Sequence, residues 1–162
     1  MKIRLAADLQ KDSIVDGLGI RTVIWTQGCS HNCPGCHNPQ SWDPKSGRDI
    51  SIDELLKVID YNDFNVTFSG GDPLFQIEKV TELAQRIKTE LGKNIWCYTG
   101  FIWENIVDDS QYRPLLETID VLVDSPFILG LRDTELRFRG SSNQRIIDVK
   151  NSLKAGEIKI LE

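Results

Sequence analysis

Short apolar runs, each bounded by Gly, Pro, Asn or Asp, recur along the chain and predict β-strands. The clearest are IRTVIWTQ (20–27), NVTFS (65–69), NIWCYT (94–99), IDVLVD (119–124) and RIIDV (145–149). IRLAA near the start and EIKIL near the end are weaker candidates. Several of these runs are apolar on both faces, which is typical of strands in a buried parallel sheet.

Amphipathic patterns lie between the predicted strands. SIDE (51–54) has the serine and glutamate of a capping box and predicts a short helix through about Ile59. Apolar residues then recur at steps of three and four over 74–91, and Gly92 follows where a helix C-cap belongs. Two shorter helices are expected, one after Gly100 and one over QYRPLLET (111–118).

This alternation of strands and helices predicts an α/β protein with right-handed crossovers. A complete (β/α)8 barrel needs about 250 residues, and the chain has 162. We therefore expect a partial, open β/α barrel of about five or six mostly parallel strands, in one domain over residues 1–162. Ligands bind beyond the carboxyl ends of the strands in such sheets. We therefore expect a ligand site beside SGGDP, YTG and Asp124, which follow or end three of the predicted strands.

Composition and charge exclude several classes of protein. A hydrophobic fraction of 40% with 27% charged residues is that of a globular protein with a real core. The net charge of −5 and the absence of a basic run argue against a nucleic acid partner. No apolar stretch has the length of a signal peptide or membrane span, so we expect no membrane association and a cytoplasmic protein with reduced thiols.

Three of the four cysteines lie close together in GCSHNCPGC: Cys29, Cys33 and Cys36. A structural zinc site takes four ligands, and a thioredoxin-like dithiol needs a single C-x-x-C. An iron–sulfur cube takes one thiolate on each iron, so three thiolates leave one iron open to another ligand. The open-iron cluster fits the C-x3-C-x2-C spacing best. Zinc, with His31 or His37 as fourth ligand, and dithiol chemistry are the alternatives.

The fourth cysteine, Cys97, lies within an apolar strand pattern and is expected to be a buried core thiol. The two histidines of the loop are expected not to be ligands. Gly28 and Gly35 let a short loop wrap closely around a cluster and direct backbone N–H groups at its sulfurs.

The C-x3-C-x2-C spacing is the signature of the radical S-adenosylmethionine superfamily. Within it, the chain resembles the activases of glycyl-radical enzymes, and most of all those of anaerobic ribonucleoside-triphosphate reductase. The resemblance covers most of residues 12–149 and lies in DGLGIRTVIWTQGC (16–29), GCSHNCPGCHN (28–38), FSGGDPL (68–74), YTGF (98–101), LVDSPF (122–127) and FRGSSNQRIIDV (138–149). Two positions depart from it: Leu18 stands where the family has a proline, and Ser125 where it has a glycine.

The resemblance implies a 4Fe–4S cluster held by Cys29, Cys33 and Cys36, with S-adenosylmethionine on the open iron. Reductive cleavage would yield a 5′-deoxyadenosyl radical that takes a hydrogen atom from a glycine of the reductase. A low-potential donor such as a flavodoxin would supply the electron. The cofactors carry this oxidoreductase chemistry, so no side chain is expected to act as acid, base or nucleophile.

The same resemblance implies a set of cofactor-binding residues on the cysteine loop and at the strand ends: Gly35, Cys36, His37, Gly70, Gly71, Asp72, Thr99 and Asp124. Gly70 and Gly71 match the motif whose backbone receives the methionine amino group, because glycines let main-chain atoms approach a ligand without an intervening Cβ. A plain turn is the alternative there, and a cap or turn is the alternative for Thr99 and Asp124.

Two other functions are alternatives. One is activation of another glycyl-radical enzyme, such as pyruvate formate-lyase, and the other is a zinc-binding interaction module without catalytic activity. Only Cys97 is spare, so no second cluster is expected. The open side of a minimal barrel suits a macromolecular substrate, and residues 137–145 are a candidate segment for docking it.

Overall fold

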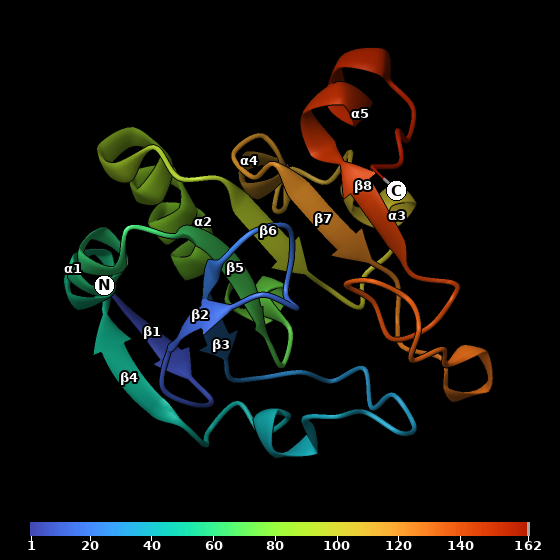
Figure 1. Ribbon diagram of the computed structural model, residues 1–162, viewed down its shortest axis with the longest axis horizontal. Coiled ribbons are helices and arrows are strands. Elements are labelled where there is room, and N and C mark those ends of the chain that lie inside the picture. Colours follow the sequence, from blue (N-terminus) through green and yellow to red (C-terminus); the bar gives the residue numbers. More distant parts are fainter. Residues whose placement is uncertain (162) are drawn as a thin grey trace.

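The computed structural model describes residues 1–161 as a mixed α/β fold with one central sheet (Figure 1). The sheet order is β4-β1-β3-β5-β6-β7-β8, and β2 pairs with β3 outside this path. In chain order the strands are β1 (Lys2–Leu5), β2 (Gln10–Ser13), β3 (Arg21–Thr26), β4 (Arg48–Ser51), β5 (Asn65–Gly70), β6 (Ile95–Tyr98), β7 (Val121–Asp124) and β8 (Arg145–Asp148).

The centre of the sheet is parallel and its margins are antiparallel. β3, β5, β6 and β7 run in one direction, whereas β1, β2, β4 and β8 run against their neighbours. β4 and β8 are the two ends of the sheet path, so the sheet is not closed. The α/β class and the parallel core are confirmed. The expected number of strands, five or six, is wrong, because the sheet of the described chain has eight strands.

The strands missed by the sequence pattern are short and polar. β2 (QKDS) and β4 (RDIS) are mostly exposed, so neither carries the apolar alternation that marks a half-buried strand. The opposite error occurs near the end of the chain. EIKIL forms only an isolated bridge between Ile160 and Ile147, although its composition suits a strand.

The described residues form five α-helices, four of which lie at predicted positions. They are α1 (Ile52–Asn62), α2 (Ile77–Arg86), α3 (Trp103–Ile106), α4 (Arg113–Leu116) and α5 (Val149–Ala155), with the short turns η1 (Pro39–Ser41), η2 (Pro73–Gln76), η3 (Ile87–Leu91) and η4 (Leu129–Leu131). The Ser51 side chain caps α1 by accepting the Glu54 N–H at 3.1 Å, and Gly92 ends η3 with φ of 64°. Both caps are confirmed. α5 was not predicted. No helix in residues 1–161 is long and apolar enough to span a bilayer.

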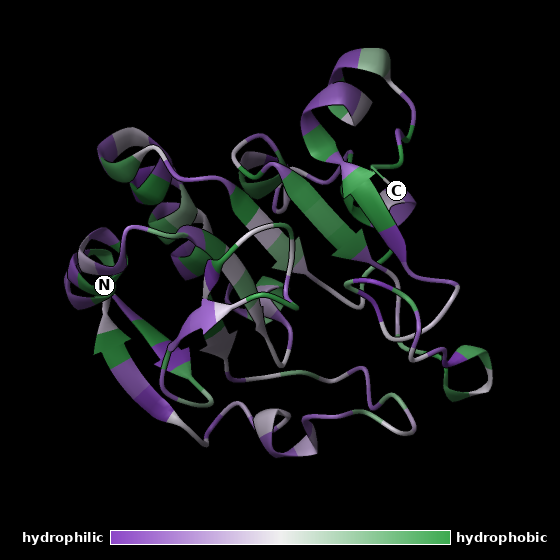
Figure 2. Cartoon of the chain, in the orientation of Figure 1, coloured by the Kyte–Doolittle hydropathy of each residue, from purple (hydrophilic) through white to green (hydrophobic). Residues whose placement is uncertain are grey.

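The two faces of the sheet have separate cores. Alternate residues of a strand point to opposite faces, so Cys97 joins the large core beneath the helices while its neighbour Trp96 joins a small cluster on the other face. The small cluster also contains Val121, Val123 and Ile146. Both faces are covered here, and the hydrophobic residues of β7 and the two middle residues of β8 are buried (Figure 2).

A buried arginine joins the amino ends of the parallel strands. Arg21 donates to the carbonyls of Leu18 and Val66, both at 2.8 Å, and its guanidinium lies over the Trp96 ring at 5.5 Å. Burial lowers the pKa of Arg21 to about 10. A Cβ on Gly17 would lie 2.8 Å from the Arg21 side chain, which explains the glycine in this segment. The amino ends are therefore fixed, and the opposite, carboxyl ends are left for the site.

Candidate functional site

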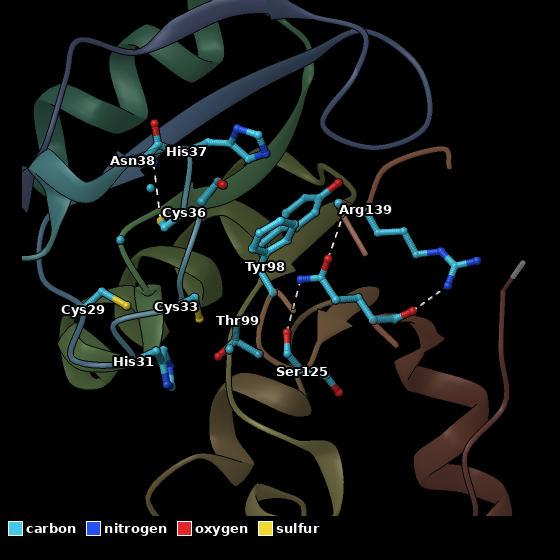
Figure 3. Close-up of a pocket in the computed structure, with 17 residues that line it drawn as sticks. Cys29, His31, Cys33, Cys36, His37, Asn38, Tyr98, Thr99, Ser125 and Arg139 are labelled. Carbon is cyan, nitrogen blue, oxygen red and sulfur yellow. Dashed lines mark hydrogen bonds between the residues drawn. The ribbon is translucent and has the colours of Figure 1, made fainter. Parts of the chain in front are cut away.

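The carboxyl ends of β3, β5, β6 and β7 and the loop after β3 enclose a cavity of about 200 Å³. Figure 3 shows the three thiols on one side, Ser125 and Arg139 on the other, and Tyr98 and Thr99 between them. The structure thus brings all three predicted cluster ligands to one cavity, at the sheet edge where the strand directions predicted it.

The base of the cysteine loop is fixed by backbone hydrogen bonds. Gly28 N–H donates to Ser41 O at 2.7 Å, and Cys29 N–H donates to Trp42 O at 3.0 Å. Asp72 N–H donates to Gly28 O at 2.8 Å, which joins the loop to the end of β5. The first ligand position is therefore held by the same element that carries the glycine motif.

Each of the three sulfurs has a backbone N–H beside it. The backbone N–H of His31 stabilises the thiolate form of Cys29, and the backbone N–H of Phe127 does the same for Cys33. The Asn38 N–H donates to the Cys36 Sγ at 3.4 Å. Such N–H groups stabilise thiolates and cluster sulfurs.

Burial raises the pKa of Cys29 to about 11 and also raises that of Cys33, and in both cases the neighbouring N–H opposes the shift. Both thiols are therefore protonated at neutral pH until a metal binds.

The three thiols line one cavity. In residues 1–161, no three His, Cys, Asp or Glu side chains approach closely enough to hold a single metal ion. Zinc requires its ligands at about 2.0–2.3 Å from one centre, whereas a cube binds each thiolate through a different iron.

Gly70 and Gly71 line the cavity, and the structure gives a second reason for them. A Cβ on Gly70 would lie 2.4 Å from the backbone N and O of Thr26. On Gly71 it would lie 2.5 Å from Gly28 O. The glycines therefore allow β5 to pack against β3 and the cysteine loop, besides leaving room for a ligand.

Comparison with known proteins places the chain in a family. Residues 15–147 match the model described as a 4Fe-4S single cluster domain. An anaerobic ribonucleoside-triphosphate reductase-activating protein of Vibrio cholerae is 40% identical over 142 residues, 82% of this chain and 90% of that protein. The one of Salmonella typhimurium is 38% identical over 140 residues, 81% of this chain and 90% of that protein. The chain belongs to this activating-protein family.

More distant matches extend the comparison. The activating protein of Enterobacteria phage T4 is 30% identical over 139 residues, 82% of this chain and 86% of that protein. A solved structure, QueE from Escherichia coli, aligns with a TM-score of 0.44 and 18% identity, over 61% of this chain and 53% of that one.

Among the residues expected to bind a cofactor in an activating protein, His37 and Thr99 line the cavity with the cysteines and glycines. Gly35 does not line it, and packs instead against Leu129, whose Cδ1 would be 2.8 Å from an added Cβ. The carboxylates of Asp72 and Asp124 do not line it either.

The two aspartates are buried behind the cavity wall and bind other protein groups. Asp72 accepts from the Thr99 hydroxyl at 2.9 Å and the Gly100 N–H at 2.9 Å. Asp124 accepts from the Trp103 N–H at 2.8 Å and from Arg145 at 2.5 Å. These carboxylates hold the strand ends together through hydrogen bonds and an ion pair, and a cofactor contact of either residue stays a prediction.

Cys97 is a buried core thiol, as expected. It faces the helices, it is absent from the cavity lining, and burial raises its pKa well above the usual value.

Sequence reasoning missed several residues that line the cavity: Tyr98, Ser125, Phe127, Arg139 and Gln144. All five residues lie within motifs that carry the family resemblance. The motifs could therefore have pointed to them, although the sequence analysis assigned these residues no role. Ser125 has φ of 81°, a left-handed conformation that favours glycine. This explains why the activating-protein motif has a glycine where this chain has serine.

Proposed function

We propose that the chain is an oxidoreductase that generates the glycyl radical of anaerobic ribonucleoside-triphosphate reductase. Cys29, Cys33 and Cys36 would hold a 4Fe–4S cluster, and S-adenosylmethionine would bind its open iron. The observation that carries the proposal is the common cavity of these thiols and the Gly70–Gly71 backbone at the carboxyl ends of the parallel strands. The relatives named as activating proteins of this reductase support the choice of partner.

When bound, the cluster and S-adenosylmethionine would supply a 5′-deoxyadenosyl radical able to take the glycine hydrogen atom. The role of this chain is then to bind and orient. The three thiolates would fix the cluster, and the Gly70–Gly71 backbone would receive the methionine end of the cofactor. In this proposal the open sheet is the partial β/α barrel of the radical S-adenosylmethionine superfamily, formed by a single domain.

A second cavity offers room for the adenosyl group and the partner glycine. It measures about 670 Å³ and is lined by residues 14–16, Thr134 and residues 136–140 together with His37 and Tyr98. Four residues line both cavities: His37, Tyr98, Arg139 and Gly140. Sites for molecules of cofactor size occupy about 300–1,000 Å³, so the first cavity alone is too small for cofactor and substrate. The glycine would enter through the second cavity, beside the segment 137–145.

The decisive test is radical formation on the partner. The chain, reconstituted with iron and sulfide without oxygen, is mixed with the reductase, dithionite and S-adenosylmethionine. We expect a brown protein with about four irons, release of 5′-deoxyadenosine, and an EPR doublet from a glycyl radical. A doublet on pyruvate formate-lyase but not on the reductase would favour the other activase. One tightly bound zinc and no visible absorption would favour the interaction module. Replacing dithionite with reduced flavodoxin tests the proposed electron donor.

The entry route gives a separate prediction. Ile14 lines the second cavity and is 70% exposed, so Ile14→Asp should leave the fold intact while placing a charge where the partner docks. We expect the KM for the reductase to rise about tenfold, which corresponds to about 1.4 kcal/mol, if Ile14 is one of the minority of interface residues that carry most of the binding energy.

Cluster content should not change in Ile14→Asp, because Ile14 does not line the cavity of the three thiols. Tyr61→Asp is the matched control, because Tyr61 is 90% exposed on α1 and lines neither cavity. Equal KM values for the two variants would refute the route.

A further inference from the structure

The side chain of His31 is bound to the sheet from the middle of the cysteine loop. Its Nε2 lies 2.6 Å from Asp72 Oδ2, so the ring donates to a carboxylate at the end of β5. The ring also meets the Phe75 and Phe101 rings edge-on, with centroids 5.4 and 4.9 Å away. Figure 3 shows it on the cysteine side of the cavity, near Cys33.

Asp72 is a fixed anchor for this bond. Its side chain is 1% exposed and also accepts from the Thr99 hydroxyl, the Gly100 N–H and the Leu74 N–H, at 2.9 to 3.0 Å. A buried carboxylate with this many donors is held in one orientation. Because the donors come from η2 and from the end of β6, the carboxylate joins two neighbouring strand ends to the loop.

The surrounding backbone leaves space for the histidine ring. A Cβ on Gly100 would lie 2.6 Å from His31 Cδ2 and 2.8 Å from Nε2. The glycine of the YTGF motif therefore lets the ring pack directly against the end of β6. The sequence analysis gave Thr99 of this motif a cofactor contact but assigned no contact to Gly100.

The loop has different anchors along its length. Its base is held by the backbone bonds of Gly28 and Cys29, and Cys33 receives the Phe127 N–H. In the described chain, the His31–Asp72 bond links the loop to the strand ends through a side chain, as does the contact of the His37 ring with the Phe127 ring at 5.7 Å. His31 lies between two of the three proposed ligands. It restrains the backbone on both sides of itself.

We propose that His31 is a positioning residue that fastens the cysteine loop to Asp72 and so keeps Cys29 and Cys33 directed into the cavity. The bond occupies Nε2 of the ring, and in this proposal His31 acts on the cluster through the loop. This inference rests on the proposed cluster ligation but on neither S-adenosylmethionine cleavage nor the identity of the partner.

Two substitutions separate the hydrogen bond from the ring packing. His31→Phe keeps an aromatic ring against Phe75 and Phe101 but removes the donor. His31→Gln loses the ring but carries an amide nitrogen at a similar reach. Ser30→Ala is the matched control, since Ser30 is an exposed neighbour on the same loop.

The measurement is the rate at which an iron chelator bleaches the reconstituted holoprotein without oxygen. We expect His31→Phe to lose iron about 10- to 100-fold faster than the unmodified protein, the usual effect of removing a group that orients a metal ligand. His31→Gln should stay within about threefold of the unmodified protein, because a neutral donor replaces the lost one. Ser30→Ala should be unchanged.

A double variant tests the route of the effect. If His31 acts through Asp72, His31→Phe combined with Asp72→Asn should bleach no faster than the faster single variant. The inference would be overturned if the double variant bleached at the product of the two single effects. It would also be overturned if His31→Phe bleached no faster than Ser30→Ala, or if His31→Gln bleached as fast as His31→Phe.

Folding of each apoprotein is checked by circular dichroism. Should His31→Phe fail to fold, His31→Asn replaces it, because the shorter amide cannot reach Asp72. His31→Asn should then bleach as fast as expected for the phenylalanine variant, and a normal rate would refute the proposal. An unmodified protein that binds no iron–sulfur cluster would instead contradict the proposed function.

Discussion

Cys33→Ala is expected to abolish glycyl radical formation and to leave the reconstituted protein without a stable 4Fe–4S cluster. Cys33 is one of the three thiols that line the cavity, so its loss leaves a cube with two protein ligands and two open irons. Iron and sulfide content, the visible absorption and the EPR signal of the reduced cluster measure the effect directly.

Cys97→Ala is the control for Cys33→Ala. Both remove a thiol, but Cys97 faces the helix-covered core and not the cavity. We expect Cys97→Ala to keep full iron content and radical formation and to lose about 1 kcal/mol of unfolding free energy, as is usual for a small change in a core. Loss of the cluster in Cys97→Ala would show that the cube has a fourth protein ligand and would contradict the open iron.

Gly70→Ala is expected to lower the free energy of unfolding by about 2–5 kcal/mol. The left-handed conformation at φ of 107° contributes about 1–2 kcal/mol of this loss. The collision of the new Cβ with the Thr26 backbone at 2.4 Å contributes about 1–3 kcal/mol more, because β3 and β5 must move apart. Urea unfolding of the apoprotein measures the change as a lower midpoint with an unchanged slope.

Gly92→Ala separates these two contributions. Gly92 also has positive φ, 64°, but no atom lies within 4 Å of the position of its Cβ. Only the conformational cost applies, so the loss should be about 1 kcal/mol. Equal losses in Gly70→Ala and Gly92→Ala would mean that strand packing is not the reason for the glycine at position 70.

The same comparison bears on the glycine motif as a sequence signal. The sequence alone suggests that Gly70 and Gly71 leave space for a ligand. The structure shows that they also leave space for the β3 end and the cysteine loop. The packing of the apoprotein therefore already requires a glycine pair in this motif. For this reason the glycine pair alone is weak evidence that a cofactor binds beside it.

The sequence by itself determined the features that depend on neighbouring residues. The apolar runs located β3, β5, β6, β7 and β8, the capping signals located the ends of α1 and η3, and the cysteine spacing located the loop. These features are local, because hydrophobic periodicity, side-chain caps and left-handed glycines are set within a few residues.

Only the tertiary structure decided which of the candidate residues reach the cavity. Thr99 and Asp72 both lie at strand ends, yet Thr99 lines the cavity while the Asp72 carboxylate is buried behind it. The His31–Asp72 bond joins residues 41 positions apart, and the antiparallel pairing of β8 and the open edges of the sheet depend on strand order. Such contacts form between segments distant in sequence, and local periodicity carries no information about which of those segments meet.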